Sequence, residues 1–176
     1  MTLVIRPYQP CDAEGANAVA RAAFAQYEPH YDDWPAFIER IGRLADLGAE
    51  GDLLVAEQDG AVVGAVLHVP PGRPRSAIFP LEWSVVRMLV VAPEARGQGA
   101  GRKLMAACLR CARAVGAPAV VLHTSPVMAT ALRMYQAIGF VRDRDIAPIQ
   151  GMAYGRYMLP AAGIAQALAA LEAPQD

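Results

Sequence analysis

The stretch that decides the fold covers residues 85–104 and reads VVRMLVVAPEARGQGAGRKL. It begins with an apolar, β-branched run that predicts a buried strand, which Pro93 ends. Glycine then occupies alternate positions at Gly97, Gly99 and Gly101, and the chain passes directly into the Ala- and Leu-rich pattern of an amphipathic helix. A strand, a glycine-rich loop and a helix in this order predict an anion-binding site.

The chemistry of this site is that of a helix N-terminus. The first amides of a helix have no intrahelical acceptor, and the aligned peptide dipoles leave partial positive charge there. Glycines without a Cβ let the backbone bend tightly and let a phosphate approach the amides. Arg96, Arg102 and Lys103 add positive charge around the same turn. We therefore expect this loop to bind a phosphate group.

Spacing separates this loop from two other phosphate-binding loops. The nucleotide-triphosphatase pattern G-x-x-x-x-G-K-[ST] occurs nowhere in the chain. A dinucleotide fingerprint requires G-x-G-x-x-G and an acidic residue about 20 positions later. Here the glycines run G-x-G-x-G, and the next expected strand ends in His123-Thr124-Ser125. Both alternatives are excluded.

The remaining pattern resembles the acyl-coenzyme A (CoA) signature R/Q-x-x-G-x-G/A of the GNAT N-acetyltransferase superfamily, with Arg96, Gly99 and Gly101 at the matching positions. Residues 131–140, ALRMYQAIGF, resemble the A-x-x-L-Y-x-x-x-G-F block of the same superfamily, with Met134 in place of leucine. Two motifs in the order and at the separation seen in the superfamily are more specific than either one. The resemblance covers residues 50–160 well, whereas residues 1–50 match only in their strand-helix-helix pattern.

The resemblance implies direct acetyl transfer from acetyl-CoA to a primary amine of a small molecule or peptide. Tyr135 matches the tyrosine that protonates the leaving thiolate. A non-catalytic acyl-CoA-binding sensor or regulatory module is the alternative, because two residues depart from the family pattern: Val85 stands where relatives often have a carboxylate, and Met128 where many have asparagine. The retained tyrosine favours the enzyme.

The proton acceptor has several alternatives. Glu82 is the carboxylate nearest to Val85 along the chain, and we predict that it acts with Tyr135 in catalysis, as the base or as a contact to the acceptor. Alternatively, Glu82 is a solvated charge at the rim of the site. Carboxylates between the first two helices, or a water relay without a carboxylate, remain open. His123 at a strand end could relay a proton, although such histidines are more often structural.

The resemblance also assigns residues to the two substrates. Contacts to acetyl-CoA are expected from the central strand, the glycine loop and the start of the helix that carries Tyr135, that is from Met88, Leu89, Val90, Val91, Arg96, Gly97, Gln98, Gly99, Ala100, Gly101, Arg102, Met128 and Ala131. Acceptor contacts are expected around the first helix-loop-helix and before the central strand, from Tyr27, Glu28, Tyr31, Trp34 and Trp83.

Hydrophobic periodicity and turn residues give the remaining elements. Strands are expected at 3–6, 53–57, 61–69, 78–91, 119–124, 140–146 and 152–159, and helices at 12–26, 34–47, 100–115, 127–138 and 161–171. Asp59-Gly60 between two β-branched runs predicts a hairpin. The fold class is α/β (α+β), with a mixed, mostly antiparallel central sheet of about seven strands flanked by helices.

Composition bounds the class of protein. The 176 residues suit one domain, 1–176, with a frayed tail at 171–176. A net charge of −1 argues against nucleic-acid binding, and no uncharged apolar run reaches the length of a membrane span. Cys108 and Cys111 form a C-x-x-C without a second pair, so we expect no metal. A cytoplasmic protein is expected, with a homodimer through the last helix or a strand edge.

Overall fold

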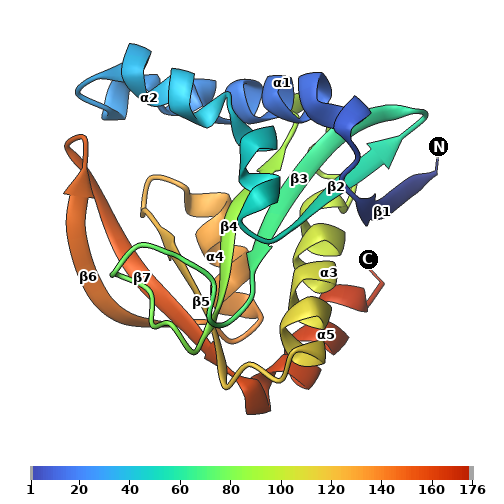
Figure 1. Ribbon diagram of the computed structural model, residues 1–176, viewed down its shortest axis with the longest axis vertical. Helices are drawn as coiled ribbons and strands as arrows, with labels where there is room; N and C mark the ends of the chain where they lie inside the picture. Colours follow the sequence, from blue (N-terminus) through green and yellow to red (C-terminus); the bar gives the residue numbers. More distant parts are fainter. Residues whose placement is uncertain (1, 175–176) are drawn as a thin grey trace.

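The apolar run of residues 85–91 lies in the middle of the sheet in the computed structural model, which describes residues 2–174 (Figure 1). Seven strands pair in the order β1-β2-β3-β4-β5-β7-β6. Their bounds are β1 Leu3–Pro7, β2 Asp52–Gln58, β3 Ala61–Val69, β4 Ser84–Val91, β5 Ala119–Thr124, β6 Val141–Ile149 and β7 Met152–Pro160. Neighbouring strands are antiparallel except β4 and β5, which are parallel. The expected mixed, mostly antiparallel sheet is confirmed.

Five α-helices flank the sheet in the described part of the chain: α1 Ala13–Phe24, α2 Trp34–Ile41, α3 Ala100–Ala114, α4 Ala129–Ala137 and α5 Ile164–Glu172. Helices α1 and α2 pack with one hydrophobic cluster, and α3, α4 and α5 pack with the other. Figure 1 shows α1 and α2 crossing one end of the strands, with α3 beside α5. Gln175 and Asp176, the end of the expected tail, lie outside the described residues, while α5 continues through Glu172. None of the described helices has the length and apolarity needed to cross a bilayer.

The second expected helix, 34–47, is divided in the structure. Helix α2 ends at Ile41, and a 3-10 helix follows at Leu44–Ala49. Gly42 lies between them, and the guanidinium of Arg21 donates a hydrogen bond to its carbonyl at 3.2 Å. A glycine ends a helix readily, and a side chain from α1 here satisfies one of the carbonyls that the helix leaves free.

Alternation along the strands places apolar side chains in both clusters. In β2, Leu53 and Val55 join the cluster under α1, whereas Leu54 and Ala56 join the cluster under α3. The period of two is that of a strand covered on both faces. The hairpin between β2 and β3 turns at Asp59 and Gly60, both with positive φ, as the Asp-Gly pair predicts.

Strand β4 breaks this alternation with a β-bulge. Ala65 and Leu67 of β3 pair with Val90 and Arg87 of β4, so two steps along β3 match three along β4. Met88 adopts φ +55, which is uncommon for a residue other than glycine. Val85 and Val90 consequently face the same cluster although they are five positions apart. Because of the bulge, every later residue in β4 points to the face of the sheet opposite to the one that regular alternation would give it.

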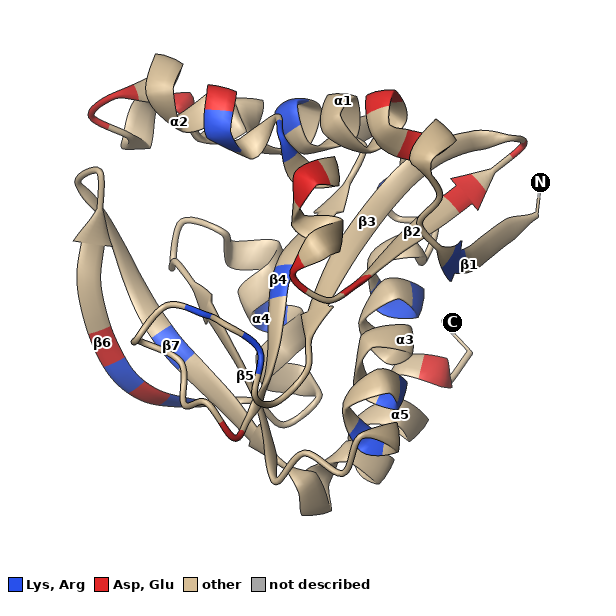
Figure 2. Cartoon of the chain, in the orientation of Figure 1, with Lys and Arg blue, Asp and Glu red and all other residues tan. Residues whose placement is uncertain are grey.

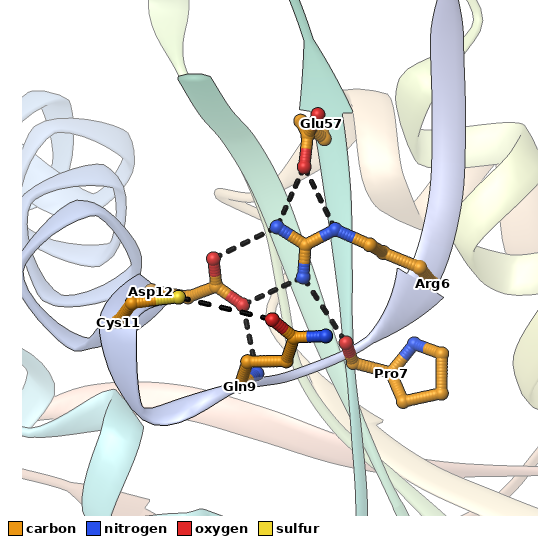
Figure 3. Close-up of polar contacts among 6 residues, drawn as sticks. All are labelled: Arg6, Pro7, Gln9, Cys11, Asp12 and Glu57. Carbon is orange, nitrogen blue, oxygen red and sulfur yellow. Dashed lines mark hydrogen bonds and ion pairs between the residues drawn. The ribbon is translucent and has the colours of Figure 1, made fainter. Parts of the chain in front are cut away.

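Arg6 fastens the edge strand β1 to its surroundings (Figure 3). Its guanidinium donates to both carboxylate oxygens of Asp12, at 2.7 and 2.9 Å, and to Glu57 on β2 at 2.7 Å. Asp12 is 6% exposed and also accepts the backbone amide of Gln9. The Arg6 guanidinium holds the pKa of Asp12 below its ordinary value. One cation therefore joins β1, β2 and the start of α1.

We expect Arg6→Met to lower the free energy of unfolding by about 2 kcal/mol, because it leaves the buried carboxylate of Asp12 without its cation. Urea unfolding measures the change. The matched control is Arg43→Met, since the ion pair of Arg43 with Asp46 is 70% and 66% exposed and such pairs contribute about 0–1 kcal/mol. Equal losses in the two variants would contradict the role given to Arg6.

Candidate functional site

The site begins where β4 and β5 separate. Their parallel register comprises Ser84 with Val120 and Val85 with Val121. From Val86 onward, β4 is bordered by a cavity of about 520 Å³, and every residue from Val86 to Val91 lines it. The backbone edge of β4 is therefore open to a ligand where a continuous sheet would hold another strand.

The glycine-rich loop forms one end of this cavity. Gly97 and Gly99 adopt φ +76 and +84, and a Cβ at either position would have no heavy atom within 4 Å. Gly99 is the N-cap of α3, and the amide of Lys103 donates to its carbonyl at 3.0 Å. The amides that precede Lys103 are thus available to a ligand. Gly101 lies inside the first turn of α3, where a Cβ would make ordinary contact with Val91 at 3.6 Å.

Two arginines flank the loop. Arg96 donates a hydrogen bond to the carbonyl of Ala23 at 3.3 Å, near the C-terminal end of α1, where the helix dipole favours a cation. Arg102 donates to the carbonyl of Ala170 on α5 at 2.5 Å. Both line the cavity. Gln98 does not line it, and its side-chain oxygen accepts a hydrogen bond from Gln58 at 2.9 Å.

Helix α4 supplies the opposite wall. Met128, its N-cap, and Ala131 line the cavity, as does Tyr135 one turn further on. Tyr135 is 6% exposed, and burial raises the pKa of its hydroxyl. The hydroxyl therefore stays protonated throughout the pH range of enzyme assays and can act as a hydrogen-bond or proton donor.

His123, at the end of β5, also lines the cavity. Its Nδ1 is buried without a hydrogen-bond partner among residues 2–174. Its ring lies 5.4 Å from that of Phe79 and 5.1 Å from that of Tyr154, measured between centroids. Burial, together with the charges of Arg87 and Arg40, lowers the pKa of His123 to about 4. The imidazole is neutral at physiological pH.

The residues expected to contact the acceptor divide into two groups. Tyr27 lines the cavity. Glu28, Tyr31, Trp34 and Trp83 do not, and neither does Glu82. Tyr31 lies directly behind the wall, because its hydroxyl forms a hydrogen bond with that of Tyr154, which does line the cavity.

The loop before β4 holds Glu82 and Trp83 away from the cavity. Arg75 donates to the carbonyls of Pro80 and Pro70, at 3.1 and 2.5 Å, and closes this loop on itself. Arg156 of β7, which is 5% exposed, lies over the Trp83 ring at 5.7 Å. Glu82, the carboxylate nearest to Val85 in the sequence, thus belongs to a loop with its own internal contacts and does not line the cavity.

Sequence reasoning did not assign to the site several residues that line the end of the cavity away from the glycine loop, among them Phe37 and Arg40 from α2, Arg87 from β4 and Ile149 from β6. A phenylalanine or an arginine on an amphipathic helix carries no local signal of function. Arg87 lies within the stretch 85–104 that predicts the central strand, but the sequence does not show which face of the sheet it occupies. Only the bulge beside it determines that.

A second polar cluster lies outside the cavity. The imidazole of His68, which is 0% exposed, contacts Asp52 through Nδ1 and Ser84 through Nε2, both at 2.8 Å. This arrangement resembles a catalytic triad, but Ser84 is itself fully buried. Cys111 lies nearby, with its sulfur within 4.8 Å of ligand atoms of Asp52 and His68. Since both ring nitrogens are engaged, the cluster acts as a hydrogen-bonded link between the ends of β2, β3 and β4.

Comparison with known proteins agrees with this geometry. The sequence model described as "Acetyltransferase (GNAT) family" matches residues 16–140. The chain is 40% identical over 153 residues to a mycothiol acetyltransferase of Sanguibacter keddieii, covering 76% of this chain and 48% of that protein. It is 37% identical over 94 residues to N-acetyltransferase family 8 member 2 of Rattus norvegicus, covering 53% and 40%. The chain thus spans less than half the length of these relatives.

Solved structures show the same fold. An N-acetyltransferase from Staphylococcus aureus superposes with a TM-score of 0.74 at 18% identity, covering 92% of this chain and 99% of that one. A GNAT family acetyltransferase from Brucella melitensis in complex with acetyl-CoA superposes with a TM-score of 0.61 at 25% identity, covering 90% and 88%. The chain belongs to the GNAT family of acetyltransferases.

The lining of the cavity fits the acetyl-CoA that this family uses. Free helix amides and Arg96 and Arg102 suit a diphosphate, and the open edge of β4 suits the amide groups of a pantetheine arm. The positive φ at Gly97 and Gly99, with open space where a Cβ would be, provides room for the phosphates.

We expect Gly99→Val to lower the affinity for CoA at least about 100-fold, because the side chain would occupy the open space above the amides and strain a left-handed residue. Isothermal calorimetry measures the affinity. Gly116→Val is the matched control, since Gly116 also has positive φ, at +69, with no heavy atom within 4 Å of a Cβ, but lies at the other end of α3. CoA binding by Gly99→Val as tight as by Gly116→Val would contradict the placement of the phosphates.

The low pKa of His123 predicts a pH dependence of stability. The unfolded chain takes up a proton near the ordinary value of 6.5, whereas the folded chain does so only near 4. Stability from this group is therefore lost as the pH falls from 6.5 towards 4. Between pH 7 and 5, we expect the free energy of unfolding of the parent protein to fall by about 1 to 2 kcal/mol more than that of His123→Phe. Urea titrations at both pH values measure these changes. If the free energy of unfolding fell equally in the two proteins, His123 would not be buried in its neutral form.

Proposed function

We propose that the chain transfers an acetyl group directly from acetyl-CoA to a primary amine. The observation that carries the proposal is that one cavity is lined by the glycine loop, the open edge of β4 and Tyr135. These are the parts needed to hold the phosphates, align the thioester and protonate the leaving sulfur. The amides of Gln98 to Arg102 take the diphosphate, and residues Met88 to Val91 pair with the pantetheine arm.

The thioester carbonyl is polarised by a backbone amide of β4 beside the bulge at Met88. The bulge gives this segment a conformation outside the regular ladder, and amides at such positions are free to donate to a ligand. The lone pair of the amine attacks the carbonyl carbon, the C–S bond breaks, and the thiolate takes the proton of the Tyr135 hydroxyl. The acylated nitrogen loses one proton to solvent, and a proton from solvent restores the Tyr135 hydroxyl.

The amine must be neutral to attack, and the electrostatics of the cavity favour the neutral form. The charged side chains among its described lining residues are all arginines. Their positive charge disfavours an ammonium group in the same way that Arg87 and Arg40 disfavour the imidazolium of His123. An ordered water takes the proton of the amine to solvent, because burial and the same arginines that keep His123 neutral make its imidazole a weak proton acceptor. Val85 is fully buried and supplies no base.

The test is turnover of acetyl-CoA with a panel of amines, followed by release of free CoA thiol and by mass spectrometry of the products. The proposal predicts one N-acetylated amine for each thiol released. CoA binding in the micromolar range without turnover on any amine would support a non-catalytic acyl-CoA-binding module instead.

We expect Tyr135→Phe to lower kcat about 100-fold or more, because the thiolate loses its proton donor, while the affinity for CoA changes little. Steady-state kinetics and calorimetry measure the two quantities. Tyr157→Phe is the control, because Tyr157 is buried in the same hydrophobic cluster, at 5% exposure, but does not line the cavity. An unchanged kcat in Tyr135→Phe would remove the assigned role.

A further inference from the structure

The acceptor end of the cavity has an unusual charge balance. Beyond the loop arginines Arg96 and Arg102, its lining contains two more cations, Arg40 on α2 and Arg87 on β4, and no carboxylate among the residues that the structure describes. Figure 2 shows acidic residues on the α1–α2 connection and charges of both signs on β6, whereas the charge on β4 is basic. A ligand with net positive charge is therefore repelled from this end.

Arg40 has its donors available. Its guanidinium lies over the ring of Phe37, 5.4 Å from the centroid, and no carboxylate in residues 2–174 forms an ion pair with it. Stacking on an aromatic face leaves the N–H groups in the guanidinium plane free, and they match the two oxygens of a carboxylate.

Arg87 contributes positive charge to this region, whereas one of its N–H donors is already engaged. It donates one hydrogen bond to Glu50 at 2.7 Å, and the two side chains are 36% and 40% exposed. Both arginines act on the same neighbour, since their charges each lower the pKa of His123. Arg40, Arg87 and His123 all line the same cavity.

Aromatic and aliphatic side chains form the remaining walls of this region. Phe24 ends α1, Tyr27 lies in the 3-10 helix Ala25–His30 that follows, Phe37 and Ile41 come from α2, and Tyr154 comes from β7. Burial of an apolar group against these walls would contribute to binding, whereas a polar group would have to find hydrogen-bond partners among mostly apolar side chains.

A bridge between distant parts of the chain lies beside this end. The amide of Asp32 donates to the carbonyl of Gln150 at 2.9 Å, and the Tyr31 hydroxyl bonds to that of Tyr154. Gly151 permits the contact, because a Cβ there would lie 2.5 Å from the Asp32 carboxylate. Figure 1 shows the tip of the β6–β7 hairpin beside the α1–α2 connection. A bridge at this end favours a small acceptor over a polypeptide threaded past it.

We propose that the acceptor is a small amine that carries its own carboxylate and an apolar side chain, that is an apolar amino acid, and that Arg40 binds the carboxylate. This inference rests on the proposed acetyl transfer to an amine. Arg87 provides additional positive charge beside the carboxylate, the aromatic walls take the side chain, and the amine is left facing the bulge in β4.

The experiment compares kcat/KM for L-phenylalanine, L-phenylalaninamide, spermidine and a hexapeptide with N-terminal phenylalanine. The proposal predicts that the acid is preferred over the amide by about tenfold or more, the strength of one charged hydrogen bond, and over spermidine and the peptide by more. A preference for the amide, spermidine or the peptide would overturn the proposed acceptor while leaving acetyl transfer to an amine established.

Arg40→Gln is expected to bring the ratio of kcat/KM for acid to that for amide close to one. Arg43→Gln is the matched control, because Arg43 follows α2 directly, pairs with exposed Asp46 and does not line the cavity. A ratio that stays tenfold in Arg40→Gln would overturn the role of Arg40 as the carboxylate contact. Thermal unfolding of both variants verifies that they are folded.

A binding measurement separates failure of this inference from failure of acetyl transfer. N-acetyl-L-phenylalanine and N-acetyl-L-phenylalaninamide are titrated into the CoA-loaded protein by calorimetry. Binding of the acid about tenfold tighter than the amide, and loss of that difference in Arg40→Gln, supports the carboxylate site even if no amine is turned over. Equal affinities would overturn it even if turnover is observed.

Discussion

The structure depends on the point where β4 and β5 stop pairing. The two strands are parallel neighbours at Ser84 and Val85, and from Val86 onward a cavity borders β4. A sheet that continued there would hide the backbone groups of β4 in a ladder. Because the strands diverge, the same groups are exposed along a channel that begins at the N-terminus of α3 and ends beneath α2. One interruption of the sheet therefore supplies both a backbone surface for the donor and a volume for the acceptor.

The bulge at Met88 determines what that surface presents. By inserting an extra residue opposite β3, it places Val85 and Val90 on one face and turns the segment between them out of the regular ladder. Positive φ at a residue with a side chain has a conformational cost, and the packing of β3 and β4 must outweigh it. Backbone strain in the middle of a central strand is consistent with a segment that serves binding as well as stability.

The source of positive charge differs between the two ends of the cavity. In the proposed reaction, the dipole of α3 and the loop arginines bind the anionic phosphates at one end, and Arg40 and Arg87 keep the other end positive. Glu82, the base expected from sequence, does not line the cavity, and positive charge near a bound amine favours its neutral form. Burial lowers the pKa of His123, and the same positive charge lowers it further.

Local patterns in the sequence predicted much of this arrangement, because the phosphate loop, the hairpin at Asp59-Gly60 and the helix carrying Tyr135 each lie within one short stretch. The acceptor end was harder to predict, since its walls come from α2, β4, β5, β6 and β7, and tertiary packing alone brings them together. The bulge left no trace in the apolar run, where Met88 looks like any other strand residue. Glu82 and Trp83 follow their loop away from the cavity because Arg75 and Arg156 hold it there, an effect that spacing along the chain does not reveal.

The most direct test of the central claim is titration of the 15N-labelled protein with desulfo-CoA, followed residue by residue in amide NMR spectra. Binding between β4 and β5 predicts that the largest shifts occur at the amides of residues 97–102 and of residues 86–91. Shifts that spare the amides of residues 86–91, or no shifts at all, would contradict the claim that the divergence of β4 and β5 forms the binding site.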